Sequence, residues 1–210
     1  MSFTTLKSLV EKTRNLQESI SLWVPKYSFI YMYFPSSESR DLLADKLREV
    51  LIGLDFGTQY AIKNKLGKGA SSNVFRLDRL RDRQSFAGKF IKHKKLQEDP
   101  RGVAMLMQEI NIMRHVQHRN IVKLHEVYEV ANGVVLVLDL VEGCELNKIA
   151  SKLTDRQIEE VFHALIETTA YLQAEGIVHR DLKPNNILIE TTQKRGRESV
   201  KIIDFGLAAY

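Results

Sequence analysis

The chain has 210 residues, of which 44% are apolar, and a formal net charge of +5 at pH 7. This length allows one medium-sized domain with an extension. A single cysteine, Cys144, excludes an internal disulfide and fits a reducing compartment. The longest apolar run, residues 29–34, is too short to span a bilayer, and the N-terminus lacks the pattern of a secretion signal. We therefore expect a cytoplasmic protein that is not bound to membranes.

The charge is distributed unevenly along the chain. Residues 1–60 carry seven basic and seven acidic side chains, residues 61–101 carry a net +8, and residues 102–210 a net −3. A basic segment beside an acidic one can indicate nucleic-acid binding. Solvated faces of strands and a helix explain the same pattern better, and we expect no nucleic-acid partner.

Residues 1–59 form an N-terminal extension with few chemical motifs. The spacing of apolar residues predicts a short amphipathic helix up to about residue 20. Residues 24–34 are rich in aromatic and β-branched side chains and predict one or two strands, followed by a turn over 35–39 and a helix over 41–51. Residues 24–52 resemble the tail of a pleckstrin-homology domain. The alternative is a segment that packs on the adjacent domain.

From Tyr60 onward the sequence carries chemical motifs. Residues 61–66 predict a strand, followed by the glycine-containing run of residues 67–74, whose backbone amides could approach phosphates closely. A glycine pair alone marks an ordinary hairpin more often. Lys89 then lies inside an apolar strand, where a lysine is costly unless it is paired. Glu109 follows 20 residues later in the helical pattern of residues 103–116 and is a candidate partner.

The densest group of polar residues lies near the C-terminal end, where residues 179–186 read His-Arg-Asp-Leu-Lys-Pro-Asn-Asn. Asp181 could accept a proton from a hydroxyl nucleophile, and Lys183 could neutralise charge on a transferring phosphoryl group. Asn186 and Asp204, the latter in an Asp-Phe-Gly run, could supply oxygens to a hard divalent cation such as Mg²⁺.

These motifs together resemble the eukaryotic protein kinases of the serine/threonine class, most closely the calcium/calmodulin-dependent group. The resemblance covers residues 60–210, which we interpret as a partial protein kinase domain. It implies an α+β, protein-kinase-like fold with a complete β-rich N-lobe and an incomplete helical C-lobe. It also implies that ATP and Mg²⁺ bind in the cleft between the lobes.

The resemblance also implies a role for each matching residue. It makes Asp181, Lys183, Lys89 and Glu109 catalytic, and Asn186 and Asp204 ligands of the metal. Among the nucleotide contacts, Leu138 guards the adenine pocket, the main chain of Asp139 and Val141 faces the adenine edge, and Glu145 meets the ribose or a basic substrate. The full set of implied nucleotide-binding residues is Leu66, Gly67, Lys68, Gly69, Ala70, Ser71, Ser72, Asn73, Val74, Ala87, Lys89, Leu138, Asp139, Val141, Glu145 and Leu188.

The remaining elements follow from periodicity and capping. Residues 134–143 predict a buried strand, and two short apolar runs around a polar insertion, residues 187–189 and 200–203, predict a hairpin. Thr154 and Gln157 form a capping box for a helix over 158–174. We expect this helix to bury Val161, Phe162, Leu165 and Ile166.

The expected function is ATP-dependent phosphoryl transfer to a protein serine or threonine hydroxyl. The resemblance ends four residues after Gly206, before an activation segment, so we expect a fragment or a truncated form. The alternative is a non-catalytic, kinase-like module that binds nucleotide or another protein. The expected partners are ATP, a protein substrate with Ser or Thr, and a regulatory partner for the exposed apolar face of the C-lobe.

Overall fold

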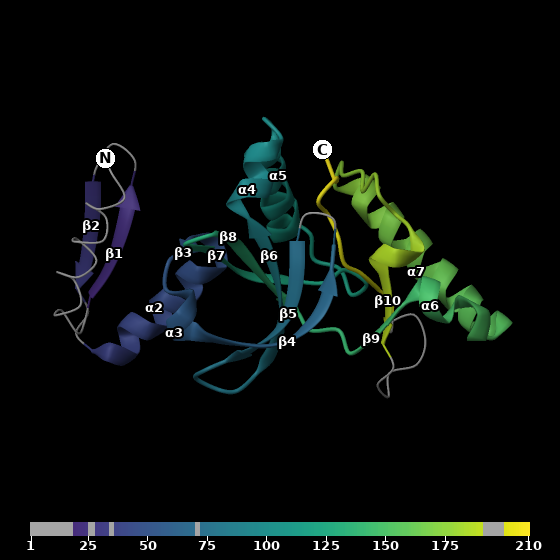
Figure 1. The fold of residues 1–210 in the computed structure, drawn as a ribbon, viewed down its shortest axis with the longest axis horizontal. Coiled ribbons are helices and arrows are strands. Elements are labelled where there is room, and N and C mark those ends of the chain that lie inside the picture. The colour runs from purple at the N-terminus through teal and green to yellow at the C-terminus, as the bar shows by residue number, and fades with distance from the viewer. Residues whose placement is uncertain (1–18, 25–27, 34–35, 70–71, 191–199) are drawn as a thin grey trace. The chain divides into compact units, whose positions relative to one another are not determined.

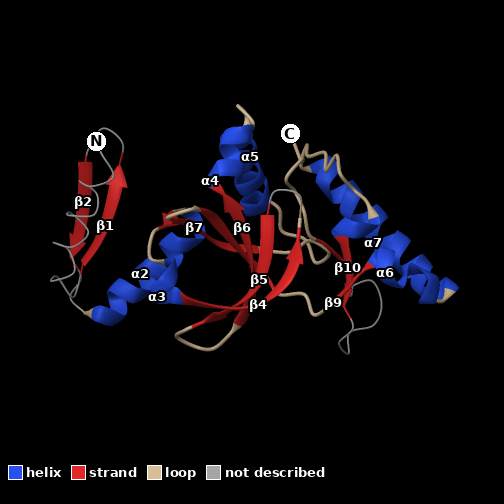
Figure 2. Ribbon diagram, viewed as in Figure 1, coloured by secondary structure: helices blue, strands red, loops and turns tan. Residues whose placement is uncertain are grey.

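The computed structural model describes residues 19–24, 28–33, 36–69, 72–190 and 200–210. The chain divides into two compact units, Met1–Leu51 and Ile52–Tyr210. Both units combine strands with helices (Figures 1 and 2), so the α+β class is confirmed.

The described residues of the first unit form a hairpin and a helix. Strands β1 (Ser19–Val24) and β2 (Ser28–Tyr33) pair antiparallel, so the two-strand alternative is confirmed, although the first strand begins before residue 24. Helix α2 (Ser37–Val50) begins within the predicted turn, because the Ser36 hydroxyl accepts a hydrogen bond from the Ser39 amide and caps the helix there. The helix expected up to residue 20 lies outside the described residues, except for its last two positions, which belong to β1.

The second unit is built on a six-stranded sheet. Its spatial order is β3-β7-β8-β6-β5-β4, and all neighbours are antiparallel except β3 and β7. The strands are β3 (Ile52–Gly53), β4 (Tyr60–Lys68), β5 (Ser72–Arg79), β6 (Ser85–Lys92), β7 (Leu124–Val130) and β8 (Gly133–Asp139).

Both faces of this sheet are packed, because successive side chains of a strand point to opposite faces. In β8, Leu136 joins a large cluster that includes residues of helix α5 (Gly102–His115). Val135 and Val137 join a second cluster on the other face, which we call the aromatic core. The aromatic core consists of Phe56, Tyr60, Leu77, Phe86, Tyr128, Val135 and Val137.

Residues 52–59 complete the aromatic core, although we expected them to belong to the N-terminal extension. Helix α3 (Phe56–Gln59) buries Phe56 to 6% exposure, and its ring contacts those of Tyr60, Phe90 and Tyr128. The preceding β3 pairs with β7. The compact second unit therefore begins at Ile52.

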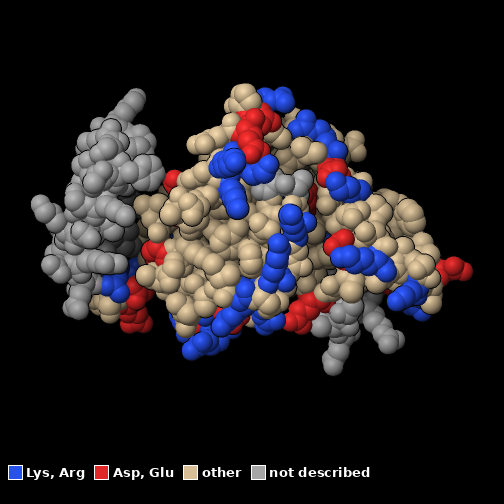
Figure 3. Space-filling model, in the orientation of Figure 1, with Lys and Arg blue, Asp and Glu red and all other residues tan. Residues whose placement is uncertain are grey.

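Helix α5 (Gly102–His115) lies within one residue of its predicted span and buries Leu106, Ile110 and Met113. A short helix, α4 (His93–Glu98), precedes it and was not predicted, because its lysines carry no apolar periodicity. Figure 3 shows Lys and Arg side chains gathered at the surface over β4 and β5, which belong to the basic segment of residues 61–101. This is the arrangement expected for a solvated face.

The described residues of the C-terminal half form a small sheet of order β11-β10-β9 and one long helix. The expected hairpin is present as β10–β11, and the insertion between its strands, residues 191–199, lies outside the described residues. The capping box of Thr154 and Gln157 is confirmed at the start of α7. The elements are β9 (Gly143–Glu145), α6 (Leu146–Ile149), η1 (Ala150–Lys152), α7 (Asp155–Ala174), η2 (Pro184–Asn186), β10 (Ile187–Glu190) and β11 (Val200–Ile202).

The prediction that α7 buries Phe162 and Ile166 is wrong. Their exposed fractions are 59% and 62%, whereas Val161 and Leu172 are buried. Residues four apart share one face of a helix, so Phe162 and Ile166 form a stripe of their own beside the packed one.

Candidate active site

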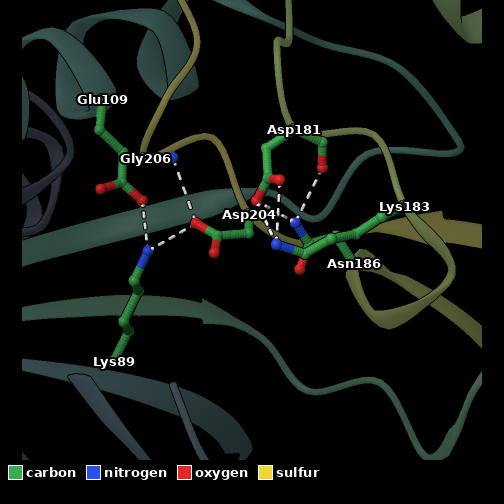
Figure 4. A network of polar contacts seen from close by, with 7 residues as sticks. All are labelled: Lys89, Glu109, Asp181, Lys183, Asn186, Asp204 and Gly206. Atoms are coloured by element: carbon green, nitrogen blue, oxygen red, sulfur yellow. Dashed lines mark hydrogen bonds and ion pairs between the residues drawn. The ribbon is translucent and has the colours of Figure 1, made fainter. Parts of the chain in front are cut away.

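A buried ion pair joins the sheet to helix α5. The Lys89 ammonium in β6 lies 2.7 Å from a carboxylate oxygen of Glu109 in α5, and both side chains are almost completely buried (Figure 4). Burial by itself would lower the pKa of Lys89, but the neighbouring carboxylates of Glu109 and Asp204 raise it above its ordinary value. The lysine therefore remains charged inside the apolar strand that contains it.

Asp204 is the second partner of the same lysine. Its Oδ1 atom accepts hydrogen bonds from Lys89 Nζ at 2.9 Å and from the Gly206 amide at 3.1 Å. Burial would raise the pKa of Asp204, yet the charge and the hydrogen bond of Lys89 outweigh burial and hold it below the ordinary value. Among the residues that the structure describes, none donates a hydrogen bond to Oδ2 of Asp204, so this oxygen is available to another ligand.

A second polar group forms around Asp181. Lys183 Nζ lies 2.9 and 2.7 Å from the two carboxylate oxygens of Asp181, and Asn186 Nδ2 donates to Oδ2 and to the main-chain oxygen at 2.9 Å each. The hydrogen bond from Lys183 is the main reason why the pKa of Asp181 lies below its ordinary value. Asp181 is therefore an ionised acceptor, and its side chain is partly exposed. Figure 4 shows its contacts with Lys183 and Asn186.

The loop that carries Asp181 is held from both sides. Arg180 adopts a positive φ of 63° and donates from Nε to the Leu207 carbonyl at 2.6 Å. The buried His179 ring packs against Phe205 with centroids 4.8 Å apart, and burial lowers the pKa of His179. These contacts tie the Asp181 loop to the segment that follows Asp204.

The β10–β11 hairpin brings the two predicted metal ligands together. Ile187 pairs with Ile202, and the Ile203 amide donates to the Asn186 carbonyl at 3.1 Å. Asn186 and Asp204 therefore occupy neighbouring ends of the two strands (Figure 4). The side-chain nitrogen of Asn186 donates hydrogen bonds to Asp181. Of these two residues, the side-chain oxygen of Asn186 and the Oδ2 atom of Asp204 are therefore the atoms that can bind a cation.

This donor set fits Mg²⁺. Mg²⁺ prefers oxygen ligands and is held by one or two carboxylates, with water and phosphate completing its coordination. No group of three or more His, Cys, Asp or Glu side chains suited to a metal occurs within the described ranges. The five charged side chains of the two polar groups carry one excess negative charge, because Glu109, Asp181 and Asp204 outnumber Lys89 and Lys183.

The glycine-containing run forms the end of the β4–β5 hairpin. Gly67 pairs with Val74 and Lys68 with Asn73, while Ala70 and Ser71 lie outside the described residues. The Gly69 amide donates to the Ser72 carbonyl at 2.9 Å, so this amide is already used within the hairpin. A Cβ added at Gly67 would meet nothing within 4 Å, which leaves its backbone accessible from outside.

The residues expected around the adenine lie on neighbouring strands. Ala87 in β6 pairs with Leu138 in β8, and Leu188 in β10 pairs with Glu145 in β9. Glu145 also accepts a hydrogen bond from Lys148 at 2.6 Å, so its carboxylate already has a partner within the protein. Of the other expected contacts, Val74, Asp139 and Val141 are half-buried, and Leu66 is exposed.

Two contacts at this site were not predicted from the sequence. The Gly206 amide holds Asp204, and His125 lies 2.7 Å from the Asp139 carboxylate. The Asp-Phe-Gly run could have suggested the first contact, but no local signal pointed to His125.

A cavity of about 620 Å³ also opens beside α5. It is lined by none of the predicted site residues but by Ala104, Met107, Gln108, Asn111, Arg180, Ala209 and Tyr210.

Comparison with known proteins shows the family to which the sequence is similar. Residues 60–210 match the family described as "Protein kinase domain". Over 156 residues, 73% of this chain, the sequence is 39% identical to calcium/calmodulin-dependent protein kinase type II of Caenorhabditis elegans. It is 37% identical to human serine/threonine-protein kinase H1 over 155 residues, which make up 72% of this chain. It is 35% identical to CBL-interacting protein kinase 11 of Oryza sativa subsp. japonica over 168 residues, 77% of this chain.

The matched regions are only part of each relative. They cover 21% of the Caenorhabditis kinase, 35% of the human kinase and 31% of the rice kinase. The chain therefore spans about a third or less of the length of these three relatives. None of the helices in the described parts of the chain is long and apolar enough to cross a membrane.

Proposed function

The chain belongs to the protein kinase family, and on this premise we propose that it binds ATP with Mg²⁺ and supports phosphoryl transfer to a protein serine or threonine hydroxyl. The observation that carries the proposal is that two polar groups adjoin where the Ile203 amide donates to the Asn186 carbonyl. The first group is Lys89, Glu109 and Asp204, and the second is Asp181, Lys183 and Asn186. One excess negative charge and two uncommitted oxygens suit a divalent cation that accompanies a polyphosphate.

Each side chain has a role that its contacts allow. Lys89, fixed by Glu109, would hold the phosphates of the nucleotide, and Mg²⁺ bound through Asn186 and Asp204 would neutralise phosphate charge. Asp181 is ionised and close to the surface, where it can orient a substrate hydroxyl and accept its proton. Lys183 already contacts Asp181 and can stabilise the transferring phosphoryl group. In phosphoryl transfer by protein kinases, the protein acts mainly by positioning the reactants and by stabilising charge.

A second candidate is a non-catalytic module that binds nucleotide and a regulatory protein. The exposed stripe of Phe162 and Ile166 favours this alternative, because large apolar side chains that are side by side at the surface often mark a contact site. The two candidates share the nucleotide site and differ in phosphoryl transfer to a peptide.

Calorimetric titration of the full chain with a non-hydrolysable ATP analogue and Mg²⁺ tests the nucleotide site. We expect Lys89→Met to weaken binding by about tenfold or more, since a charge-assisted contact to phosphate is lost. Lys92→Met is the matched control, because Lys92 lies in the same strand with an exposed side chain. Equal binding by the wild type and Lys89→Met would refute the assigned pocket.

A further inference from the structure

Asp139, the last residue of β8, is held by the start of β7 and by the residue before it. His125 Nε2 lies 2.7 Å from Oδ1 of Asp139, and the Lys123 amide donates to Oδ2 at 3.0 Å. The Asp139 amide in turn donates to the Lys123 carbonyl at 3.0 Å. Both carboxylate oxygens and the main chain of Asp139 are therefore fixed by residues of one neighbouring segment.

A β-bulge aims His125 at this position. Leu124 pairs with Leu138 and Glu126 with Val137, so two steps along β7 correspond to one step along β8, and His125 is the extra residue. A bulge re-aims the side chain of the inserted residue and is found frequently beside functional sites. The buried Phe86 ring supports the imidazole edge-on, with centroids 5.0 Å apart.

The Asp139 carboxylate is a strong acceptor at neutral pH. Burial would raise its pKa, but the hydrogen bonds from His125 and from the Lys123 amide hold it below the ordinary value. Hydrogen bonds to an ionised acceptor are about twice as strong as those between neutral groups. The contact with His125 is thus strong enough to fix the main chain where β8 ends.

We propose that His125 is a positioning residue that fixes the main chain of residues 139–141 and thereby sets the preference for adenine over guanine. This inference rests on the proposed function, in which that main chain faces the adenine edge. Adenine presents an amino group at C6 and guanine an oxygen, so a correctly placed backbone carbonyl accepts from the first and repels the second. A site that fixes such an acceptor rejects the wrong base far better than a mobile one.

The test measures the dissociation constants of non-hydrolysable ATP and GTP analogues with Mg²⁺ for the full chain. We expect His125→Leu to reduce the preference for ATP by about tenfold, while His125→Gln, which keeps a donor at similar reach, stays within about twofold of wild type. His93→Leu is the matched control, because His93 also faces a carboxylate, that of Glu129 in β7 at 3.9 Å. If His125→Leu does not fold, His125→Asn removes the same contact with a shorter polar side chain.

Hydrogen exchange of the amides of residues 139–143 without nucleotide separates this inference from the proposed function. Faster exchange in His125→Leu, but not in His93→Leu, is expected even if the wild type binds neither nucleotide. That combination would refute the nucleotide function and leave the positioning role supported. Unchanged exchange, or an unchanged ATP preference in a wild type that binds ATP, would overturn the proposal. A preference lost equally in His93→Leu would overturn it as well, because general destabilisation would then be the cause.

Discussion

Lys89 brings a full positive charge into the packed interior of the sheet, where an unpaired ammonium would be very costly. Two carboxylates contact it, Glu109 from α5 and Asp204 from the segment after β11. The three residues are distant in sequence, so this ion triad exists only when the sheet, the helix and the C-terminal segment are assembled. Without nucleotide, the two carboxylates of the triad neutralise the Lys89 ammonium. A bound phosphate would compete with Asp204 for contact with this ammonium.

The ionisation of Asp204 predicts a dependence of stability on pH. The pKa of Asp204 is lower in the folded chain than in the unfolded chain, where aspartate titrates near pH 3.9. Its ionisation therefore favours the folded state above about pH 3.9, and this contribution is lost as the pH falls through the folded value. We expect the unfolding temperature of Asp204→Asn to decrease less steeply than that of the wild type between about pH 5 and 3. Parallel curves for the two proteins would contradict the assignment.

At the scale of elements, the β3–α3 segment is the part of the second unit that precedes the residues matching the kinase family. Gly53 in β3 lies so close to the Tyr128 ring that an added Cβ would approach a ring carbon to 2.6 Å. The hydroxyls of Tyr128 and Tyr60 both donate to the buried Glu126, at 2.6 and 2.9 Å. A substitution at Gly53 should therefore disturb the whole aromatic core.

We expect Gly53→Val to lower the free energy of unfolding by about 1–3 kcal/mol, as overpacking of a filled core does. Gly57→Ala is the matched control, because a Cβ at Gly57 meets nothing within 4 Å. Chemical denaturation followed by fluorescence measures both variants. If the two glycine substitutions cost the same, close packing of Gly53 against the Tyr128 ring is not what destabilises Gly53→Val.

The elements also show what a sequence can predict. The strand of Lys89, the helix of Glu109 and the capping box of Thr154 were predicted because each depends on local spacing. The start of α2 was missed, because capping by Ser36 competed with a turn signal. The bulge at His125 could not be predicted, since it is a property of two paired strands. Periodicity likewise identifies α7 as amphipathic without showing which of its adjacent apolar stripes is packed.

For the chain as a whole, the exposed apolar stripe on α7, Phe162 and Ile166, predicts weak self-association through this helix. Each large apolar side chain left in water forgoes on the order of 2 kcal/mol of burial. Phe162 and Ile166 are both more than half exposed, so we expect the isolated chain to bind an environment-sensitive dye and to associate weakly. The double variant Phe162→Ser, Ile166→Ser should bind less dye and sediment as a monomer.

A wild-type chain that is monodisperse and binds no dye would contradict this expectation. Substitution of the buried Val161 on the same helix is not a suitable control, because it would create a cavity. The exposed residue Arg156 on α7, changed to Ser, provides a matched surface control. It should leave dye binding unchanged.

We propose that Asn186 and Asp204 form a metal site which makes nucleotide binding depend on Mg²⁺. The most direct measurement is the affinity of the full chain for a non-hydrolysable ATP analogue, determined by calorimetry with Mg²⁺ and again with a chelator. We predict binding at least about tenfold tighter with Mg²⁺, and a much smaller difference in Asp204→Asn, which loses a charged ligand. Equal affinity with and without Mg²⁺ in the wild type, or an undiminished Mg²⁺ effect in Asp204→Asn, would contradict the claim.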